Sequence, residues 1–407
     1  MKKMWVILIL AITLRLFLAF STFHPDIQTF NLAGKVVSSG NILNLYDFLP
    51  SLSDDNPIKN TAVFNYPPAI YFFHGVFNFL FNLLGLPVNQ FLQDFPSNYG
   101  NMLFNLHLLL LKIPYLIFDL LTGFILFKLF SDKKKQELAL ILWLFNPINL
   151  YASYMMGQFD IIPTFFALLS IYFVAKNKLN LAAISLGVGI AFKLYPLFLV
   201  VPLIILGRNF QERIKLIILS LVPYFATMLP YLPSHNFRSV ALFTNQSSKS
   251  LYAQISVSGG ESIIIFPALL IVFYLIIFTS REKFITWKIY SIPLFLFFIF
   301  THFHPQWLIW LTPFFILEVV SNRYKNTLAI SLIFISFLGS LFFFDPSLTI
   351  GLFAPIFPSL HSTMSIWEIM NIKIDYNYSR SLLQTIFAGS LTYLIYQYFP
   401  RRVPDED

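Results

Sequence analysis

The chain has 407 residues, of which 57% are hydrophobic and only 11% are charged, and it carries a net charge of +8 with a mean hydropathy of +0.71. An average soluble domain has roughly 25% charged residues, so this composition excludes a water-soluble protein. The basic residues lie at the ends of apolar runs, which argues against nucleic-acid binding. The absence of cysteine excludes disulfides, thiolate nucleophiles, iron–sulfur clusters and Cys-ligated zinc.

Apolar runs that could cross a bilayer recur along the whole chain. A hydrocarbon core of roughly 30 Å takes about 17 to 25 apolar residues to cross. The first run, 4–23, follows Lys2 and Lys3 and lacks a small-residue cleavage site, which favours an uncleaved span over a signal peptide. The clearest predicted spans are 5–23, 104–130, 137–154, 161–176, 214–232, 262–280, 285–303, 306–321, 327–345 and 381–399.

Two further segments, 66–86 and 179–207, are ambiguous by length, and the placement of positive charge decides between the alternatives. If 66–86 crossed the bilayer, the basic cluster 133–135 would face outward, so this segment is predicted to be a helix at the outer interface. The segment 179–207 is basic at both ends. It is therefore expected to form a hairpin of two short helices, each roughly 21 Å long, that turns at Lys193 inside the membrane.

These choices predict an all-α polytopic membrane protein of about 12 helices with both termini in the cytoplasm. Its inner loops hold most of the basic residues, among them Arg281, Lys283, Arg323, Arg401 and Arg402. We expect a single membrane domain over 1–407. Its parts are a long first outer loop with interfacial helices at 24–103, a central core at 104–232, and C-terminal spans at 233–407.

Two aspartates next to predicted spans are candidates for chemistry, because an ionisable group in hydrocarbon costs about 2.5–3.5 kcal/mol on insertion scales. Asp26 follows the first span and could accept a proton from a substrate hydroxyl, although an ordinary loop aspartate is the alternative. Asp160 follows Gly157-Gln158-Phe159 and could bind a sugar or assist Asp26. It could equally cap the helix that begins after it.

Three cations inside apolar runs also need partners. Lys193 requires a carboxylate, a polar cavity or an anionic ligand, and Asp119 in the middle of a predicted span is its expected partner. Arg15 could extend to the membrane surface or hold a phosphate with its planar guanidinium. Lys112 is expected to extend its ammonium to the surface.

The segment His302-Phe303-His304-Pro305-Gln306-Trp307 joins two predicted spans. Its two histidines could ligate a metal, but no acidic cluster beside them completes a site. Hydrogen bonding to a phosphate or sugar is the favoured function, and an interfacial belt of His and Trp is the alternative.

Several motifs in this order together resemble the GT-C superfamily of membrane glycosyltransferases, and most of all prokaryotic relatives of the GPI and polyprenol-phosphate-mannose-dependent mannosyltransferases. The resemblance covers about 20–315. The motifs are Asp26, Asn65-Tyr66-Pro67-Pro68, Asn146-Pro147, Gly157-Gln158-Phe159-Asp160, the stretch from Ala183 to Pro196 ending Phe-Lys-Leu-Tyr-Pro, and His304-Pro305-Gln306-Trp307.

The resemblance implies that Asp26 is the general base in a cavity open to the outer face, and that Asp160 is a second acid of the site. It also implies that Lys193 and His304 lie near the donor phosphate or the cavity. The residues expected to bind substrate are Arg15, Tyr66, Gln158, Lys193, His302, His304 and Gln306. Many relatives have a paired acid in the first outer loop, whereas Asp26 stands alone here, so Asp47, Asp54 or Asp160 could assist it.

The expected activity is transfer of a hexose, mannose by resemblance, from a polyprenyl-phosphate donor to a lipid or glycan acceptor. The reaction would take place at the outer face of the plasma membrane with inversion at the anomeric carbon, and no cofactor or metal is expected. Two alternatives are a flippase or transporter of lipid-linked sugars and a non-catalytic subunit of an envelope-assembly complex. A transporter more often shows paired repeats, and no repeat is seen in this sequence.

Overall fold

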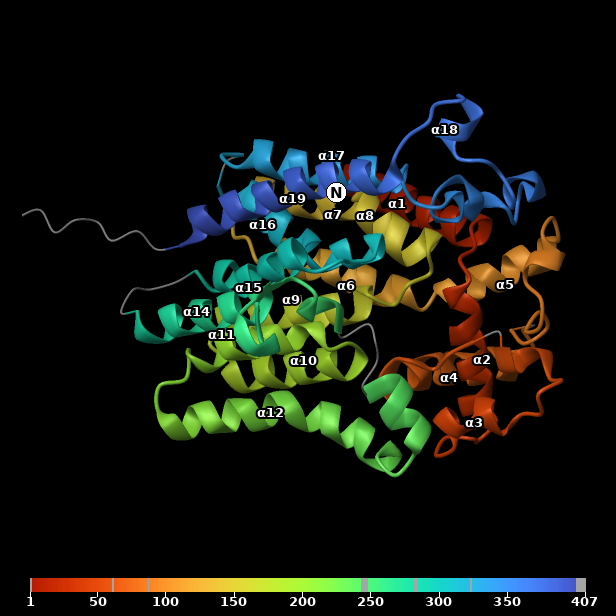
Figure 1. Ribbon diagram of the computed structural model, residues 1–407, viewed down its shortest axis with the longest axis horizontal. Helices are drawn as coiled ribbons and strands as arrows, with labels where there is room; N and C mark the ends of the chain where they lie inside the picture. The colour runs from red at the N-terminus through yellow and green to blue at the C-terminus, as the bar shows by residue number, and fades with distance from the viewer. Residues whose placement is uncertain are drawn as a thin grey trace, which may run out of the picture.

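The computed structural model describes residues 2–60, 62–86, 88–242, 248–280, 285–322 and 324–399, and this part of the chain is almost wholly helical (Figure 1). Of the predicted inner-loop cations, Arg281, Lys283, Arg323, Arg401 and Arg402 lie outside the described residues. The all-α polytopic membrane architecture predicted from the apolar runs is confirmed.

The helices have the following bounds: α1 (Lys2–Ser21), α2 (Asp26–Ser38), α3 (Leu45–Ser51), α4 (Pro68–Leu83), α5 (Met102–Lys112), α6 (Tyr115–Lys128), α7 (Lys133–Leu144), α8 (Pro147–Asn149), α9 (Ile161–Ala175), α10 (Leu179–Phe192), α11 (Val200–Ile204), α12 (Phe210–Met228), α14 (Ile265–Thr279), α15 (Thr286–Phe300), α16 (Thr312–Ser321), α17 (Thr327–Leu341), α18 (Ile366–Ile369) and α19 (Tyr376–Tyr398). A small antiparallel hairpin pairs β1 (Gln254–Ser256) with β2 (Ser262–Ile264), with Ile255 opposite Ile263.

Helices occupy most of the predicted spans, but several of these helices are shorter than a membrane crossing needs. In the described ranges, three helices are long and apolar enough to cross a membrane: Met4–Ser21, Lys133–Met155 and Phe210–Tyr231. A fourth is obtained if α5 and α6, which meet at a bend of 44° around Pro114, count as one span. Proline explains the bend, because it cannot donate a backbone hydrogen bond and its ring clashes with the preceding turn.

The two ambiguous segments have the predicted local structure. The segment 179–207 forms two short helical arms, α10 followed by the 3₁₀ turn Tyr195–Leu199 and α11, which meet at Lys193. The segment 66–86 forms α4, which packs against α2. In Figure 1, α2, α3, α4 and α5 gather on the right, beside the ends of the longer helices.

Large apolar side chains from helices along the whole described chain form one extended core. The helix α10 packs between α9 and α12, while α19 packs against α15 and α17. At one end of this bundle the turn after α1, the start of α9 and the loop after α15 come together, and the candidate site lies there.

Candidate functional site

Asp26 is the first residue of α2, five positions after Ser21, where α1 ends. Its carboxylate therefore lies at the positive end of the α2 dipole, which favours a negative charge. Gln158 Nε2 donates a hydrogen bond of 2.6 Å to Asp26 Oδ2, while the Asp26 side chain stays 43% exposed. The carboxylate is thus held by one partner and open to a second, as a general base must be.

His24 lies beside this carboxylate, with its Nδ1 3.7 Å from Asp26 Oδ2. The same nitrogen accepts the backbone N–H of Asp26 at 3.3 Å, so Nδ1 carries no proton. Burial and the nearby Lys112 lower the pKa of His24, although Asp26 opposes the shift. His24 is therefore a neutral hydrogen-bond acceptor that orients the start of α2.

A tight backbone turn at Gly157 places Gln158 against Asp26. The π-helical turn Leu150–Met155 ends just before it, and Gly157 has a φ of +65°. A Cβ at this position would lie 2.8 Å from Ile27 Cδ1, so a side chain would push the turn away from α2. Only glycine allows both this backbone conformation and this close approach.

Asp160 and Lys193 form a buried ion pair, with 2.6 Å between Asp160 Oδ1 and Lys193 Nζ. Trp310 Nε1 donates to the same oxygen at 2.6 Å. The alternative that the Asp160 side chain caps α9 does not hold, because it makes no capping hydrogen bond. The expected pairing of Lys193 with Asp119 is wrong, because Lys193 pairs with Asp160 and Asp119 pairs with Arg15.

Aromatic rings surround the Lys193 ammonium on several sides. The rings of Tyr66, Phe159, Trp307 and Trp310 have their centroids 5.2 to 5.6 Å from Lys193 Nζ, within the range of cation–π attraction. Asp160 follows Gln158, the hydrogen-bond donor to Asp26, by two residues. The two predicted acids therefore belong to one site, faced by rings on which a sugar could stack.

The predicted histidine loop contributes to the same site. His304 packs its ring 5.2 Å from that of Trp307, and its Nε2 lies 3.0 Å from Lys249 Nζ. An ammonium can only donate, so Nε2 accepts and the neutral imidazole carries its proton on Nδ1. Gln306 is buried, and its Oε1 has no hydrogen-bond partner in the described part of the chain.

Burial, Lys249 and Lys193 lower the pKa of His304 to about 4. In the unfolded chain His304 would bind a proton at its ordinary pKa of about 6.5, so the free energy of unfolding falls as the pH is lowered between about 6.5 and about 4.

Across the residues described, no three His, Asp or Glu side chains are grouped so that they could hold a metal ion.

Replacing Lys249 with Gln is expected to raise the pKa of His304 from about 4 toward its ordinary value, because one of the charges opposing protonation is removed. The measurement is ¹⁵N NMR of histidine-labelled protein during a pH titration. Lys373→Gln, at an exposed position, is the matched control and should leave the titration unchanged. An unaltered His304 titration in Lys249→Gln would contradict the contact between these two side chains.

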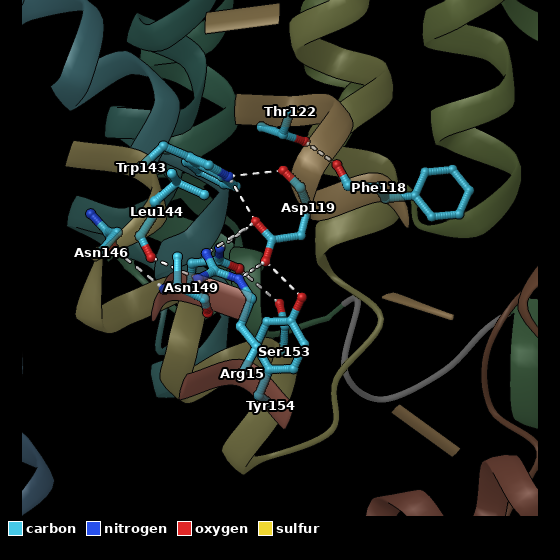
Figure 2. Close-up of polar contacts among 11 residues, drawn as sticks. Arg15, Phe118, Asp119, Thr122, Trp143, Leu144, Asn146, Asn149, Ser153 and Tyr154 are labelled. Carbon is cyan, nitrogen blue, oxygen red and sulfur yellow. Dashed lines mark hydrogen bonds and ion pairs between the residues drawn. The ribbon is translucent and has the colours of Figure 1, made fainter. Parts of the chain in front are cut away.

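Arg15 is not brought to the Asp26 site. It is fully buried, and its Nε lies 2.5 Å from Asp119 Oδ2 inside the bundle (Figure 2). Asp119 also accepts hydrogen bonds from Trp143 Nε1, Asn149 Nδ2 and the Tyr154 hydroxyl, at 2.6 to 2.8 Å. The prediction that Arg15 extends to the surface is therefore wrong, and its guanidinium is committed to a structural network.

The hydrogen bonds of Asp119 also determine the position of Gln158. Asn149 and Tyr154 belong to the helical turns that lead directly to Gly157 and Gln158. Since Asp119 binds both side chains, it fixes the segment from which Gln158 reaches Asp26.

Lys112 also differs from its prediction. It is buried, and its Nζ donates to the carbonyl oxygens of Ala19 at 3.2 Å and Thr22 at 2.5 Å. These carbonyls lie at the end of α1, where a cation is stabilised by the helix dipole. Lys112 thus binds the carbonyl groups at the C-terminal end of α1 and stabilises the turn that leads to Asp26.

Two of the three acids considered as helpers of Asp26 lie elsewhere. Asp47 accepts hydrogen bonds from Ser234 and Asn236, and Asp54 pairs with Lys59. Asp160 remains as the second acid of the site. Sequence reasoning missed Phe159, Trp310 and Lys249; Trp310 follows Trp307 by three residues, a helical spacing that places both on one face.

Comparison with known proteins identifies the same central segment. The family described as mannosyltransferase (PIG-M) matches residues 153–246. GPI mannosyltransferase 1 of Saccharomyces cerevisiae is 34% identical over 97 residues, 23% of this chain and 24% of the relative. GPI mannosyltransferase 1 of Candida albicans is 33% identical over 124 residues, 29% of each chain.

The match spans less than a third of the length of either relative. It nevertheless contains Gln158, Asp160 and Lys193, three of the residues that build the site. The predicted resemblance to membrane mannosyltransferases of the GT-C type is therefore confirmed through this central segment.

Proposed function

We propose that this protein is a mannosyltransferase that moves mannose from a polyprenyl-phosphate-linked donor to a lipid or glycan acceptor. The observation that carries the proposal is the hydrogen bond from Gln158 to Asp26, because Gln158 belongs to the matched segment that also holds the Asp160–Lys193 ion pair. An exposed carboxylate and a buried cation within one aromatic-lined site suit a reaction that removes a proton and releases an anion.

In the proposed reaction Asp26 accepts the proton of an acceptor hydroxyl as that oxygen attacks the anomeric carbon of the donor sugar. The bond between the anomeric carbon and the phosphate oxygen breaks, and the polyprenyl phosphate leaves. A single displacement inverts the anomeric configuration. Lys193 stabilises the charge that develops on the phosphate, because a fixed cation in a water-poor site interacts strongly with it.

The site would act at the outer face of the plasma membrane, with both termini in the cytoplasm, in one membrane domain. A polyprenyl tail remains in the bilayer there while its sugar reaches the interface. The leaving lipid monophosphate carries less charge than a nucleotide diphosphate, so we propose a reaction without a cofactor or an obligatory metal.

The test is transfer from radiolabelled polyprenyl-phosphate mannose and polyprenyl-phosphate glucose, by purified protein in liposomes that contain host lipid and glycan extracts. A new mannosylated product from the first donor alone is the expected result. Movement of donor across the bilayer without any new glycosidic bond would instead identify a flippase. Absence of both transfer and translocation, while the host pathway still requires the protein, would identify a non-catalytic subunit.

Replacing Lys193 with Met is expected to weaken donor use by about 10- to 100-fold, since hydrogen bonds to charged groups contribute about 1.5–3 kcal/mol. The measurement is the dependence of the transfer rate on donor concentration. The single variant leaves Asp160 buried without its cation, so the double variant Lys193→Met, Asp160→Asn serves as a second test. Lys59→Met, which removes a lysine paired with Asp54 outside the site, is the control. An unchanged donor response in both Lys193 variants would make Lys193 structural.

A further inference from the structure

A cavity of about 540 Å³ lies where α15 ends, α17 ends and α19 begins. This volume lies within the range of about 300–1,000 Å³ that is usual for small-ligand sites. One wall is apolar and includes Phe300, Phe303, Phe337, Leu383 and Phe387. Such a wall suits a hydrocarbon chain better than a polar metabolite.

The lining of the cavity also includes polar groups. Thr301 and Ser336 line it and are 3% and 2% exposed, respectively. Neither hydroxyl has a hydrogen-bond partner in the ranges that the structure describes. A buried hydroxyl without a partner is energetically unfavourable, and a ligand oxygen in the cavity would supply the missing hydrogen bond.

Arg380 supplies a cation to the same cavity. Its guanidinium lies 4.8 Å from the Phe344 ring and donates to Asn377 Oδ1. Among the described residues, no carboxylate lies within ion-pair distance of Arg380 or of Lys249. Burial and the positive charges of Lys249 and Arg380 lower the pKa of His302, which also lines the cavity. The surroundings of His302 and Arg380 are therefore positive, and no carboxylate of the described residues neutralises them.

The part of the cavity lined by His302 adjoins the site built around Asp26. The rings of His302 and His304 are 6.1 Å apart, and His304 in turn contacts Trp307, which faces Lys193. The two histidines thus connect the cavity to the proposed reaction site.

We propose that this cavity binds a lipid monophosphate, with its chain along the Phe300 and Phe387 wall and its phosphate between Arg380, His302 and the Thr301 and Ser336 hydroxyls. The assignment of that lipid as the donor or its released polyprenyl phosphate rests on the proposed function. A bilayer phospholipid has the same combination of apolar chain and phosphate, and the experiment distinguishes the two sources.

The experiment measures binding of a sugar-free polyprenyl phosphate to purified full-length protein in nanodiscs, with uncharged polyprenol and phosphatidylglycerol as competitors. Arg380→Gln is expected to weaken binding by about tenfold or more, because it removes a charged donor to the phosphate. Ser336→Leu should also weaken binding, by filling the cavity. Lys373→Gln removes a charge from an exposed position seven residues before Arg380 and should leave binding unchanged.

Displacement by unlabelled polyprenyl phosphate but not by phosphatidylglycerol would identify the isoprenoid phosphate as the ligand. Equal displacement by both lipids, with the same loss in Arg380→Gln, would identify a phospholipid site. Binding that is unaffected by Arg380→Gln and Ser336→Leu, or equally tight for polyprenol, would overturn the proposal. Because no transfer is measured, a protein without mannosyltransferase activity could still pass this test, and an active one could fail it.

Discussion

Mannosyl transfer is expected to fall by about 10²- to 10⁴-fold when Asp26 is replaced with Asn. The amide keeps the size of the side chain and can still hydrogen-bond Gln158, but it cannot accept a proton from the acceptor hydroxyl. The measurement is initial rate of transfer in liposomes at saturating donor. Donor binding should be unchanged, because the substitution affects proton removal and not the cationic groups near the phosphate.

Asp54→Asn is the matched control for this experiment. It lies in the same long loop, its side chain is 96% exposed, and its partner is Lys59 outside the site. Full activity of this variant beside an inactive Asp26→Asn would locate the effect at Asp26. Normal turnover of Asp26→Asn would remove Asp26 as the base and leave Asp160 as the acid to test next.

Replacing Asp119 with Ala is expected to lower the free energy of unfolding by about 3–5 kcal/mol, the usual effect of breaking a buried ion pair. The guanidinium of Arg15 would stay buried without an anion, and the donors of Trp143, Asn149 and Tyr154 would lose their acceptor (Figure 2). Equilibrium unfolding in mixed micelles, followed by tryptophan fluorescence, measures the loss.

The double variant Arg15→Leu, Asp119→Leu separates an unpaired charge from a general packing defect. Since apolar residues of similar size can replace a buried pair with little loss, the double variant should recover much of the stability lost in Asp119→Ala. Asp54→Ala, which breaks an exposed pair, should leave the unfolding midpoint unchanged. A double variant no more stable than Asp119→Ala would show that the Trp143 and Tyr154 hydrogen bonds dominate instead.

The sequence predicted the helical architecture because apolar length and the placement of basic residues are properties of the chain alone. The hairpin 179–207 illustrates this, since its basic ends and its turn at Lys193 sufficed to predict two short arms. The breaks inside spans were harder to foresee. Pro114 lies within one long apolar run, and a proline in such a run can either bend a helix or end it.

The pairing of buried charges could not be predicted in the same way. The sequence predicts that Lys193 needs an anionic partner, but which acid it meets depends on how each helix is rotated. Helices that are apolar on every side carry no periodic signal for that rotation. The sequence also allows Asp160 to cap α9, but its carboxylate accepts hydrogen bonds from Lys193 and Trp310 instead.

The Arg15–Asp119 pair also bears on biosynthesis. Its members are 104 residues apart, so the ribosome delivers the cation to the membrane well before the anion that neutralises it. Until α6 is inserted, α1 holds an unpaired arginine at a cost of about 2.5–3.5 kcal/mol on insertion scales. The Arg15–Asp119 contact can therefore form only after α6 has entered the bilayer.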